Sequence, residues 1–130
     1  FKEWPIFGGR WEASLQAAQQ GLTVWQKKGP QAYVTYHNAV YATGHNEGKL
    51  TAEDILAAAS KAGLAAPAPG DHTASLEKNS NLAEELGLTG TPGIIVMPVS
   101  GATPDTITVF PEAVTAERLQ AAIRKATRVK

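Results

Sequence analysis

The sequence predicts an α/β fold, because two kinds of apolar periodicity follow one another along the chain. Several long segments place apolar residues every three or four positions, which is typical of amphipathic helices. Shorter runs, rich in branched or aromatic residues and bounded by glycine or proline, indicate strands. The predicted order is one strand, four helices, two strands and a closing helix, with no internal repeat.

The first predicted element is a short strand over residues 1–7 (FKEWPIF), ended by Gly8 and Gly9. Pro5 has no backbone N–H, so this segment should be an edge strand or the end of a strand. The chain opens on Phe1 with a strand-like sequence. We therefore expect it to have been processed or cut from something longer.

Two helices should follow, the first from Arg10 to Gly29 and the second from Pro30 to about Ala42. Gly21 weakens the first by roughly 1 kcal/mol relative to alanine and predicts a bend or break. The residues expected to face inward are Trp11, Leu15, Ala18, Leu22, Trp25, Tyr33, His37, Val40 and Tyr41.

Capping signals delimit the next two helices. Thr51 and Asp54 have the spacing of a capping box, and Gly63-Leu64 is typical of a Schellman ending. Residues 65–70 (AAPAPG) resemble a linker, and a helix over residues 73–86 should then end at Gly87-Leu88 in the same way. The inward residues of these two helices should be Ile55, Leu56, Ala59, Ala62, Leu76, Leu82, Ala83 and Leu86.

The last third predicts a hairpin and a helix. Residues 93–99 and 106–110 should form antiparallel strands joined by the loop 100–105, and the apolar run in the first predicts burial on both faces. The closing helix, from Thr115 to about Ala126, should bury Leu119, Ala122 and Ile123.

Composition excludes several function classes. Twelve Lys or Arg residues balance twelve Asp or Glu residues, which argues against a nucleic-acid partner. The sequence contains no cysteine, so these residues supply no disulfide, thiol nucleophile or cysteine-ligated metal. No apolar stretch is long enough to span a membrane. We predict no cofactor, no metal ligand and no catalytic residue within the chain.

The titratable residues give no catalytic pattern. The three histidines lack metal-binding spacing, and His37 is expected to be a packed or hydrogen-bonded structural residue. The pairs Glu53-Asp54 and Glu84-Glu85 should lie on solvated helix faces. The three tryptophans are spaced as core or core-edge residues.

One segment is different, because Gly90, Thr91 and Pro92 lead directly into an apolar strand. Proline cannot donate a hydrogen bond there, and it restricts the residue before it. A cis Thr91–Pro92 bond would resolve the turn, and a trans proline at a strand start is the alternative.

Several segments in this order resemble the DsbA-like thiol–disulfide oxidoreductases. The order of helix, Gly-Leu-Thr-Gly-Thr-Pro, strand, loop, strand and helix is similar to the C-terminal half of a thioredoxin fold. The segments that carry the resemblance to the family are residues 1–6 (FKEWPI), 36–41 (YHNAVY), 50–56 (LTAEDIL), 62–64 (AGL) and 87–92 (GLTGTP).

The resemblance implies a thioredoxin-like core, incomplete at its N-terminal side, formed by residues 1–9 and 71–130, with a helical subdomain inserted at residues 10–70. It also implies a cis Pro92 after Thr91. In the family this loop pairs through its backbone with an extended or unfolded polypeptide, and we extend that substrate-binding role to Gly90. The implied location is the periplasm or the bacterial cell envelope.

The chain departs from the family in lacking its Cys-x-x-Cys and the strand and helix that carry it. Without cysteine it cannot exchange disulfides. We therefore expect the C-terminal portion of an oxidoreductase or isomerase that contributes the loop and a helical lid. We also expect a fragment, a cut remnant, or an assembly in which a missing N-terminal segment or a second copy supplies a strand. A redox-inactive thioredoxin-fold module that binds a peptide or protein is the alternative.

Overall fold

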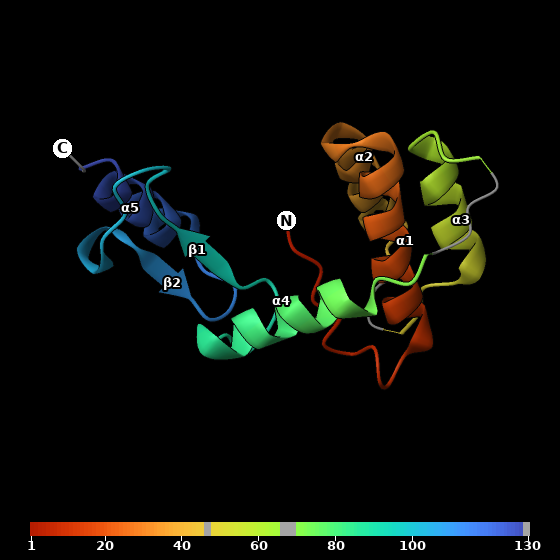
Figure 1. Ribbon diagram of the computed structural model, residues 1–130, viewed down its shortest axis with the longest axis horizontal. Coiled ribbons are helices and arrows are strands. Elements are labelled where there is room, and N and C mark those ends of the chain that lie inside the picture. The colour runs from red at the N-terminus through yellow and green to blue at the C-terminus, as the bar shows by residue number, and fades with distance from the viewer. Residues whose placement is uncertain (46–47, 66–69, 129–130) are drawn as a thin grey trace. The chain divides into compact units, whose positions relative to one another are not determined.

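The computed structural model describes residues 1–45, 48–65 and 70–128. These residues form mainly helices with one small sheet (Figure 1). The elements in chain order are α1 (Glu12–Lys28), α2 (Pro30–Ala42), α3 (Ala52–Lys61), α4 (Thr73–Glu85), β1 (Ile94–Val96), a 3-10 turn (Pro104–Thr106), β2 (Thr108–Phe110) and α5 (Ala116–Ala126).

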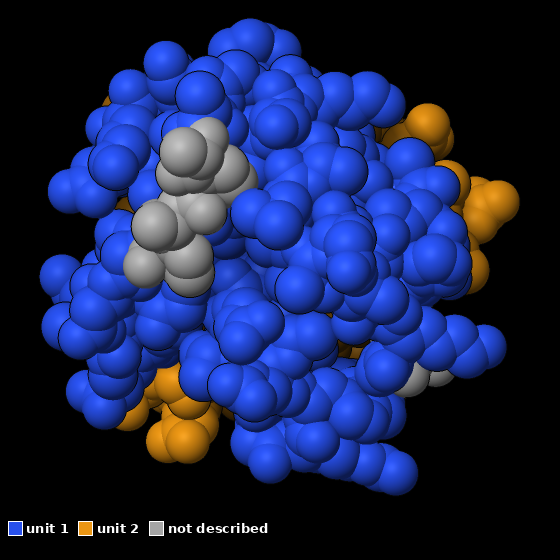
Figure 2. Space-filling view, turned by 90° about the vertical axis from the view of Figure 1, so that its right-hand side faces the viewer, with its two compact units in different colours: residues 1–79 blue, residues 80–130 orange. Residues whose placement is uncertain are grey.

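The chain divides into two compact units, residues 1–79 and 80–130 (Figure 2). The division falls inside α4, so the first half of that helix belongs to one unit and the second half to the other. The expected division into residues 1–9 with 71–130 and residues 10–70 stays a prediction. Within the described ranges, no helix is both long enough and apolar enough to cross a membrane.

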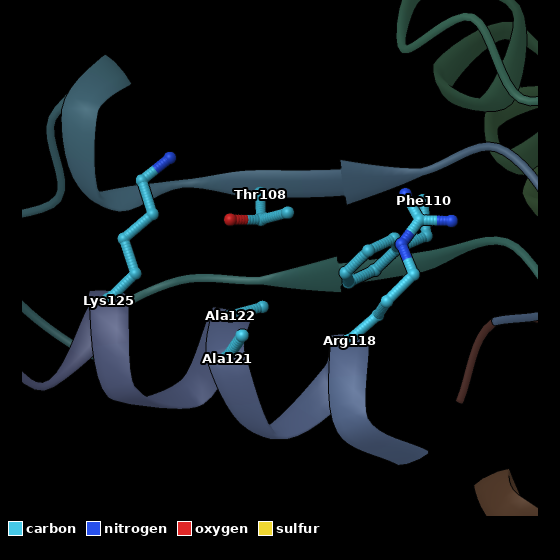
Figure 3. A pocket seen from close by; sticks show the side chains of 6 residues that line it. All are labelled: Thr108, Phe110, Arg118, Ala121, Ala122 and Lys125. Carbon is cyan, nitrogen blue, oxygen red and sulfur yellow. The ribbon is translucent and has the colours of Figure 1, made fainter. Parts of the chain in front are cut away.

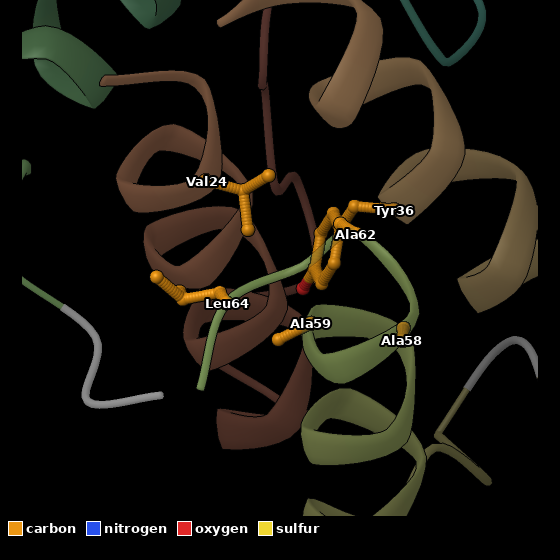
Figure 4. Packing of buried hydrophobic residues seen from close by; sticks show 6 residues of the cluster. All are labelled: Val24, Tyr36, Ala58, Ala59, Ala62 and Leu64. Carbon is orange, nitrogen blue, oxygen red and sulfur yellow. The ribbon is translucent and has the colours of Figure 1, made fainter. Parts of the chain in front are cut away.

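In unit 1, the helices α1, α2 and α3 pack against one another around a core of small and aromatic side chains (Figure 4). Tyr36 lies in the middle of this core, and its hydroxyl donates to the carbonyl of Ala17 at 2.7 Å. This bond supplies the partner that a buried phenol needs. The core residues are Val24, Tyr36, Ala58, Ala59, Ala62 and Leu64.

The buried side of α1 differs from the predicted one. Val24 is fully buried, whereas Trp25 is 54% exposed and Leu15 is 38% exposed. Gly21 does not break the helix, which runs without interruption from Glu12 to Lys28. A Cβ atom at Gly21 would lie 3.1 Å from Cε1 of Tyr36, which is closer than most such contacts. The missing side chain lets α2 approach closely on this side, and the bulky tryptophan is left at the edge.

The predicted strand over residues 1–7 is wrong. Residues 1–5 are irregular and residues 6–10 form turns, with Ile6 N–H donating to Trp4 C=O and Gly8 N–H to Pro5 C=O. No described strand lies beside this segment. A strand needs a neighbour to satisfy its backbone groups, so the polar groups here turn to local partners.

The capping predictions for α3 and α4 are confirmed. Thr51 Oγ1 accepts from Asp54 N–H at 3.1 Å, and the Asp54 carboxylate accepts from Thr51 N–H at 3.0 Å. After α3, Gly63 has φ +88° and Leu64 N–H donates to Ala59 C=O, which completes a Schellman motif. Of the predicted linker over residues 65–70, residues 66–69 lie outside the described ranges.

Unit 2 contains the predicted antiparallel hairpin, with strands shorter than expected. Ile94 pairs with Phe110, Ile95 with Val109 and Val96 with Thr108. α5 packs against the hairpin and begins at Ala116, with the predicted first residue Thr115 as its N-cap. Burial is less complete than predicted, because Ile95 and Ile123 are exposed. A sheet of two described strands has too little surface to cover both residues.

Candidate functional site

The candidate site follows the second half of α4, whose end fixes where the loop begins. Gly87 has φ +71° and its N–H donates to Glu84 C=O, while Leu88 N–H donates to Ala83 C=O, both at 3.0 Å. This is the predicted Schellman ending, and it reverses the chain direction sharply. The loop over residues 89–93 therefore starts from a rigid helix end.

Two bonds hold the first part of the loop to the end of β2. The carbonyl of Pro111 accepts from Thr89 N–H at 3.1 Å and from Gly90 N–H at 3.3 Å. At the other end, a Cβ atom on Gly93 would lie 2.5 Å from Cδ1 of Leu88, so a larger residue there requires the Leu88 side chain to move. The first part of the loop is thus tethered, and its far end packs closely against Leu88.

The middle of the loop presents a free stretch of backbone. The Thr91–Pro92 peptide bond is cis, and both side chains are exposed. Within the described part of the chain, neither the backbone nor the hydroxyl of Thr91 forms a hydrogen bond. The loop therefore offers one N–H and one C=O at Thr91, next to a proline that cannot donate.

β1 continues this stretch as a strand with an open edge. Among the described residues it pairs only with β2, so its other edge has no neighbour. Ile95, Met97 and Val99 along and beyond β1 are all exposed. An open edge flanked by apolar side chains is a surface on which an extended chain can add as a further strand.

The candidate site is polar only through its backbone and its hydroxyl groups. The segment from Leu86 to Pro104 contains no ionisable side chain, and the sequence contains no cysteine. Polar recognition must come from backbone amides, carbonyls and hydroxyls. The structure brings together the predicted residues Gly90, Thr91 and Pro92 in one exposed loop, and their binding role stays a prediction.

A titratable pair in unit 1 was missed by sequence reasoning. The hydroxyl of Tyr33 donates to the side-chain carboxylate of Glu3. The backbone carbonyl of Glu3 accepts a second bond from Asn79 Nδ2 at 2.9 Å. Burial raises the pKa of the Glu3 carboxyl, although the Tyr33 hydroxyl opposes this change. Burial and the neighbouring carboxylate also raise the pKa of Tyr33. The sequence signal that could have indicated this pair is the position of Glu3 among the aromatic residues of segment 1–7.

His37 and His45 each lie against other side chains of unit 1. His37 lies between the rings of Phe1 and Tyr41, with centroid distances of 4.5 and 4.8 Å. His45 Nδ1 lies 2.8 Å from the Asp54 carboxylate, and this hydrogen bond is the first cause of the lowered pKa of Asp54. In the ranges that the structure describes, no three His, Asp or Glu residues are grouped as metal ligands.

Comparison with known proteins gives one structural neighbour. No protein-family model matches the sequence, and no curated protein matches it. The chain is similar to the crystal structure of BcfH from Salmonella enterica Typhimurium, with 35% sequence identity and a TM-score of 0.73. The similarity covers 97% of this chain and 55% of the BcfH chain. The chain therefore spans about half the length of BcfH.

Proposed function

We propose that this chain is the C-terminal portion of a DsbA-like protein thiol–disulfide oxidoreductase or isomerase. In this role it contributes the loop Gly90–Pro92, which binds substrate, and a helical lid over residues 10–70. The observation that carries the proposal is the exposed backbone of Thr91 beside the cis Pro92, at the head of an open-edged strand. The similarity over 97% of the chain to a protein almost twice as long supports the idea of a portion.

The proposed substrate is an extended or unfolded polypeptide. The free N–H and C=O of Thr91 can pair with the backbone of such a chain in the manner of a β-bridge. Backbone pairing is independent of side-chain identity, which suits an enzyme that acts on many substrates. The absence of charge from Leu86 to Pro104 fits the same role, because no ionic group selects one substrate over another.

The redox step would use a dithiol from outside these 130 residues. A cysteine thiolate attacks one sulfur of a disulfide, the S–S bond breaks, and the leaving sulfur departs as a thiolate with the electron pair. The resulting mixed disulfide is resolved by attack of a second thiolate. Thr91 and Pro92 would hold the substrate strand beside these sulfurs and take no part in the electron transfer.

The open edge of β1 also supports a proposal about assembly. We propose that a strand from an N-terminal segment of the parent protein, or from a second copy, pairs with this edge and completes a thioredoxin-like sheet. The proposed location is the periplasm or the bacterial cell envelope, the usual compartment of the family that the sequence resembles. Cell fractionation of the parent protein tests this placement.

A backbone-specific binding experiment tests the peptide role. An unfolded, reduced and alkylated model protein is added to the ¹⁵N-labelled chain, and hydrogen exchange is followed by NMR. We expect protection of the Thr91 amide and no comparable protection in α3. Thr91→Val keeps the backbone and should bind normally, whereas Thr91→Pro removes the N–H and should weaken binding about tenfold or more. Protection confined to residues outside the loop and β1 would contradict the role, even if Thr91→Pro fails to fold.

The second candidate is a redox-inactive module that binds a peptide or protein through the same loop. The observation that favours it is the complete absence of cysteine from the chain. The gene of the parent protein separates the two candidates, because the enzyme requires that it encode a Cys-x-x-Cys motif upstream of Phe1. Thiol–disulfide exchange by the encoded full-length protein, lost on Cys→Ser substitution, would support the enzyme. A parent without these cysteines that still protects Thr91 would support the module.

A further inference from the structure

We infer that the loop Gly90–Pro92 and the open edge of β1 take a basic polypeptide, an extended segment that carries Lys or Arg residues. The inference rests on the proposed peptide-binding role and narrows its substrate class. Backbone pairing at Thr91 is the same for every extended chain, so it does not distinguish one segment from another. The charges placed beside the loop supply that distinction.

The charges of unit 2 are separated along the chain. Residues 80–117 contain five acidic residues and no Lys or Arg, whereas residues 118–130 contain five basic residues and no Asp or Glu. The acidic stretch includes the loop and both strands, and the basic stretch begins inside α5. The loop and the open edge therefore belong to a negatively charged part of the unit. Its acidic residues are Glu84, Glu85, Asp105, Glu112 and Glu117.

Two of these carboxylates come directly before the loop. Glu84 and Glu85 are the last two residues of α4, and both side chains are exposed. The carbonyl of Glu84 accepts from Gly87 N–H at 3.0 Å, so this glutamate is also part of the helix ending from which the loop starts. The two carboxylates are therefore held close to the beginning of the loop.

A third carboxylate lies where the loop is bonded to the end of β2. Glu112 directly follows Pro111, whose carbonyl accepts from Thr89 N–H and Gly90 N–H. The side chain of Glu112 is exposed as well. The salt bridge found in the described ranges joins His45 and Asp54, so no described base pairs with the three glutamates. Their charge is available to a partner.

The acidic end of α4 is unfavourable for the helix itself. The last turn of a helix carries partial negative charge, and it is stabilised by Lys, Arg or protonated His. The last turn of α4 contains no basic residue and ends on two adjacent glutamates. Residues that oppose a local stability rule point to a role outside the element that contains them. Attraction of a basic chain is such a role.

Most basic residues of unit 2 lie on α5, which covers the other face of the hairpin. Figure 3 shows the side chains of Thr108 and Phe110 between β2 and α5, where the Arg118 guanidinium lies 5.5 Å from the centroid of the Phe110 ring. Ile95 pairs with Val109, which lies between these two residues in sequence. Because side chains alternate along a strand, Ile95 points away from α5 and its cations.

A Lys or Arg side chain fits both parts of this surface. Its methylene stem covers apolar area, while its charged end reaches an exposed carboxylate. Ile95 and Met97 supply the apolar part, with exposed fractions of 39% and 53%, and the three glutamates supply the carboxylates. An acidic segment would instead bring like charges together, which lowers affinity. The segment from Leu86 to Pro104 carries no charge, so the preference comes from residues beside the loop.

Three peptides that differ only in their flanks test the preference. Each has the same central run of alternating serine and valine, with two lysines, two glutamines or two glutamates on either side. Shifts of the Thr91 amide in the ¹⁵N-labelled chain give the dissociation constants. The lysine peptide should bind about five- to tenfold more tightly than the glutamine peptide, and the glutamate peptide more weakly still. The preference should fall below about twofold in 1 M salt, where the Debye length is about 3 Å.

Variants locate the carboxylates that act. Glu85→Gln and Glu112→Gln should each weaken binding of the lysine peptide about two- to threefold and leave binding of the glutamine peptide unchanged. Asp105→Asn is the matched control, because it removes the same charge beyond the three paired residues of the hairpin, a length of about 10 Å. Glu85→Gln should also leave the melting temperature unchanged or raise it, since the charge opposes the helix dipole. A lower melting temperature together with weaker binding of all peptides would make Glu85 a structural residue and overturn its binding role.

The outcomes separate this inference from the proposed function. Equal binding of the three peptides, or an equal loss in Asp105→Asn, would overturn the inference and leave the peptide-binding role intact. If no peptide shifts the Thr91 amide, both are overturned. Thr91 shifts that grow with protein concentration in the absence of peptide would identify a second copy as the occupant, and they would overturn the preference for a basic polypeptide.

Discussion

The two units bury their apolar residues to different depths. In unit 1, Val24 and Ala59 are fully buried, and Tyr36 is enclosed with its hydroxyl satisfied. In unit 2, the buried residues Ala83, Phe110, Ala122 and Ala126 are mostly small. Beside them, the hairpin exposes Ile95 and α5 exposes Ile123, and Val99 beyond β1 has no cover at all.

The difference lies in how completely each unit encloses a core. Three helices close around one another in unit 1 and bury a core fully, although Trp25 and Tyr41 on these helices are exposed. A two-stranded sheet with one packed helix cannot enclose a core in the same way, because a strand has two edges and a sheet has two faces. The exposed residues of the hairpin are therefore a candidate interaction surface, and the candidate loop lies in the same unit.

The largest expected loss of stability follows from a substitution in the closed core of unit 1. Tyr36→Ala removes the central ring and the bond to Ala17, and should lower the free energy of unfolding by about 3–5 kcal/mol. Urea unfolding followed by circular dichroism measures the change. Tyr41→Ala, on the same helix but exposed, is the control and should cost less than about 1 kcal/mol. Equal losses in both variants would show that Tyr36 does not lie in a tightly packed core.

The next largest effect concerns the partly buried Glu3 carboxylate. Tyr33→Phe keeps the ring but removes the hydroxyl that donates to Glu3, so a partly buried acceptor loses its partner. We expect a loss of about 1–3 kcal/mol at pH 7. The matched control is Tyr36→Phe, which deletes a hydroxyl bonded to a neutral carbonyl and should cost about 1 kcal/mol. A smaller loss for Tyr33→Phe than for Tyr36→Phe would contradict this assignment.

The same carboxylate predicts a pH dependence that Glu3→Gln should remove. Burial raises the folded-state pKa of Glu3 above its ordinary value of 4.5, so protonation favours the folded state. This contribution is fully present below about pH 4.5 and is lost as the pH rises through the folded-state pKa. Unfolding of wild type and Glu3→Gln is compared from pH 4 to 7. The wild type should lose stability relative to the variant across this window, and parallel curves would exclude the effect.

The helix ends were predictable from the sequence, whereas the N-terminal segment was not. Local signals were reliable, because a capping box at Thr51 and glycine endings at Gly63 and Gly87 depend only on neighbouring backbone groups. The strand over residues 1–7 was wrong, because a strand depends on a neighbour that the local pattern cannot supply. Of the candidate site, the loop residues and the antiparallel pairing of the two strands were predictable, whereas their exposure depends on what is packed around them.

Contacts between distant segments were beyond sequence reasoning for a similar reason. The spacing of Arg118 and Lys125 on one side of a helix was readable, but cations on a helix are usually a solvated face. Only the structure shows that they lie on either side of Ala121 and Ala122, next to β2 (Figure 3). Glu3 and Tyr33 are likewise thirty residues apart, and no local pattern pairs them.

Helix caps provide a smaller comparison between the units. Thr51 in unit 1 forms a reciprocal box with Asp54, and Thr51→Ala should cost about 1 kcal/mol. Thr115 in unit 2 accepts one long bond from Arg118 N–H, at 3.4 Å. Thr115→Ala should therefore lower the free energy of unfolding by less, roughly 0.3 kcal/mol. Hydrogen exchange in α3 and α5 reports each helix separately. A larger increase in exchange rate in α5 with Thr115→Ala than in α3 with Thr51→Ala, each relative to wild type, would reverse the predicted order.

The smallest effect on stability, and the most direct test of the open surface, is expected at Ile95. Its side chain is exposed on a strand whose second edge has no described partner, so Ile95→Lys should change the free energy of unfolding by less than about 0.5 kcal/mol. A lysine on an edge strand opposes pairing with another chain, because pairing would bury its charge. Sedimentation at rising protein concentration should therefore show weaker self-association than in wild type.

Gln120→Lys adds the same charge to an exposed position of α5 and should leave association unchanged. If both lysines act equally, net charge explains the result. If only Ile95→Lys acts, the strand edge is the surface through which unit 2 takes a partner.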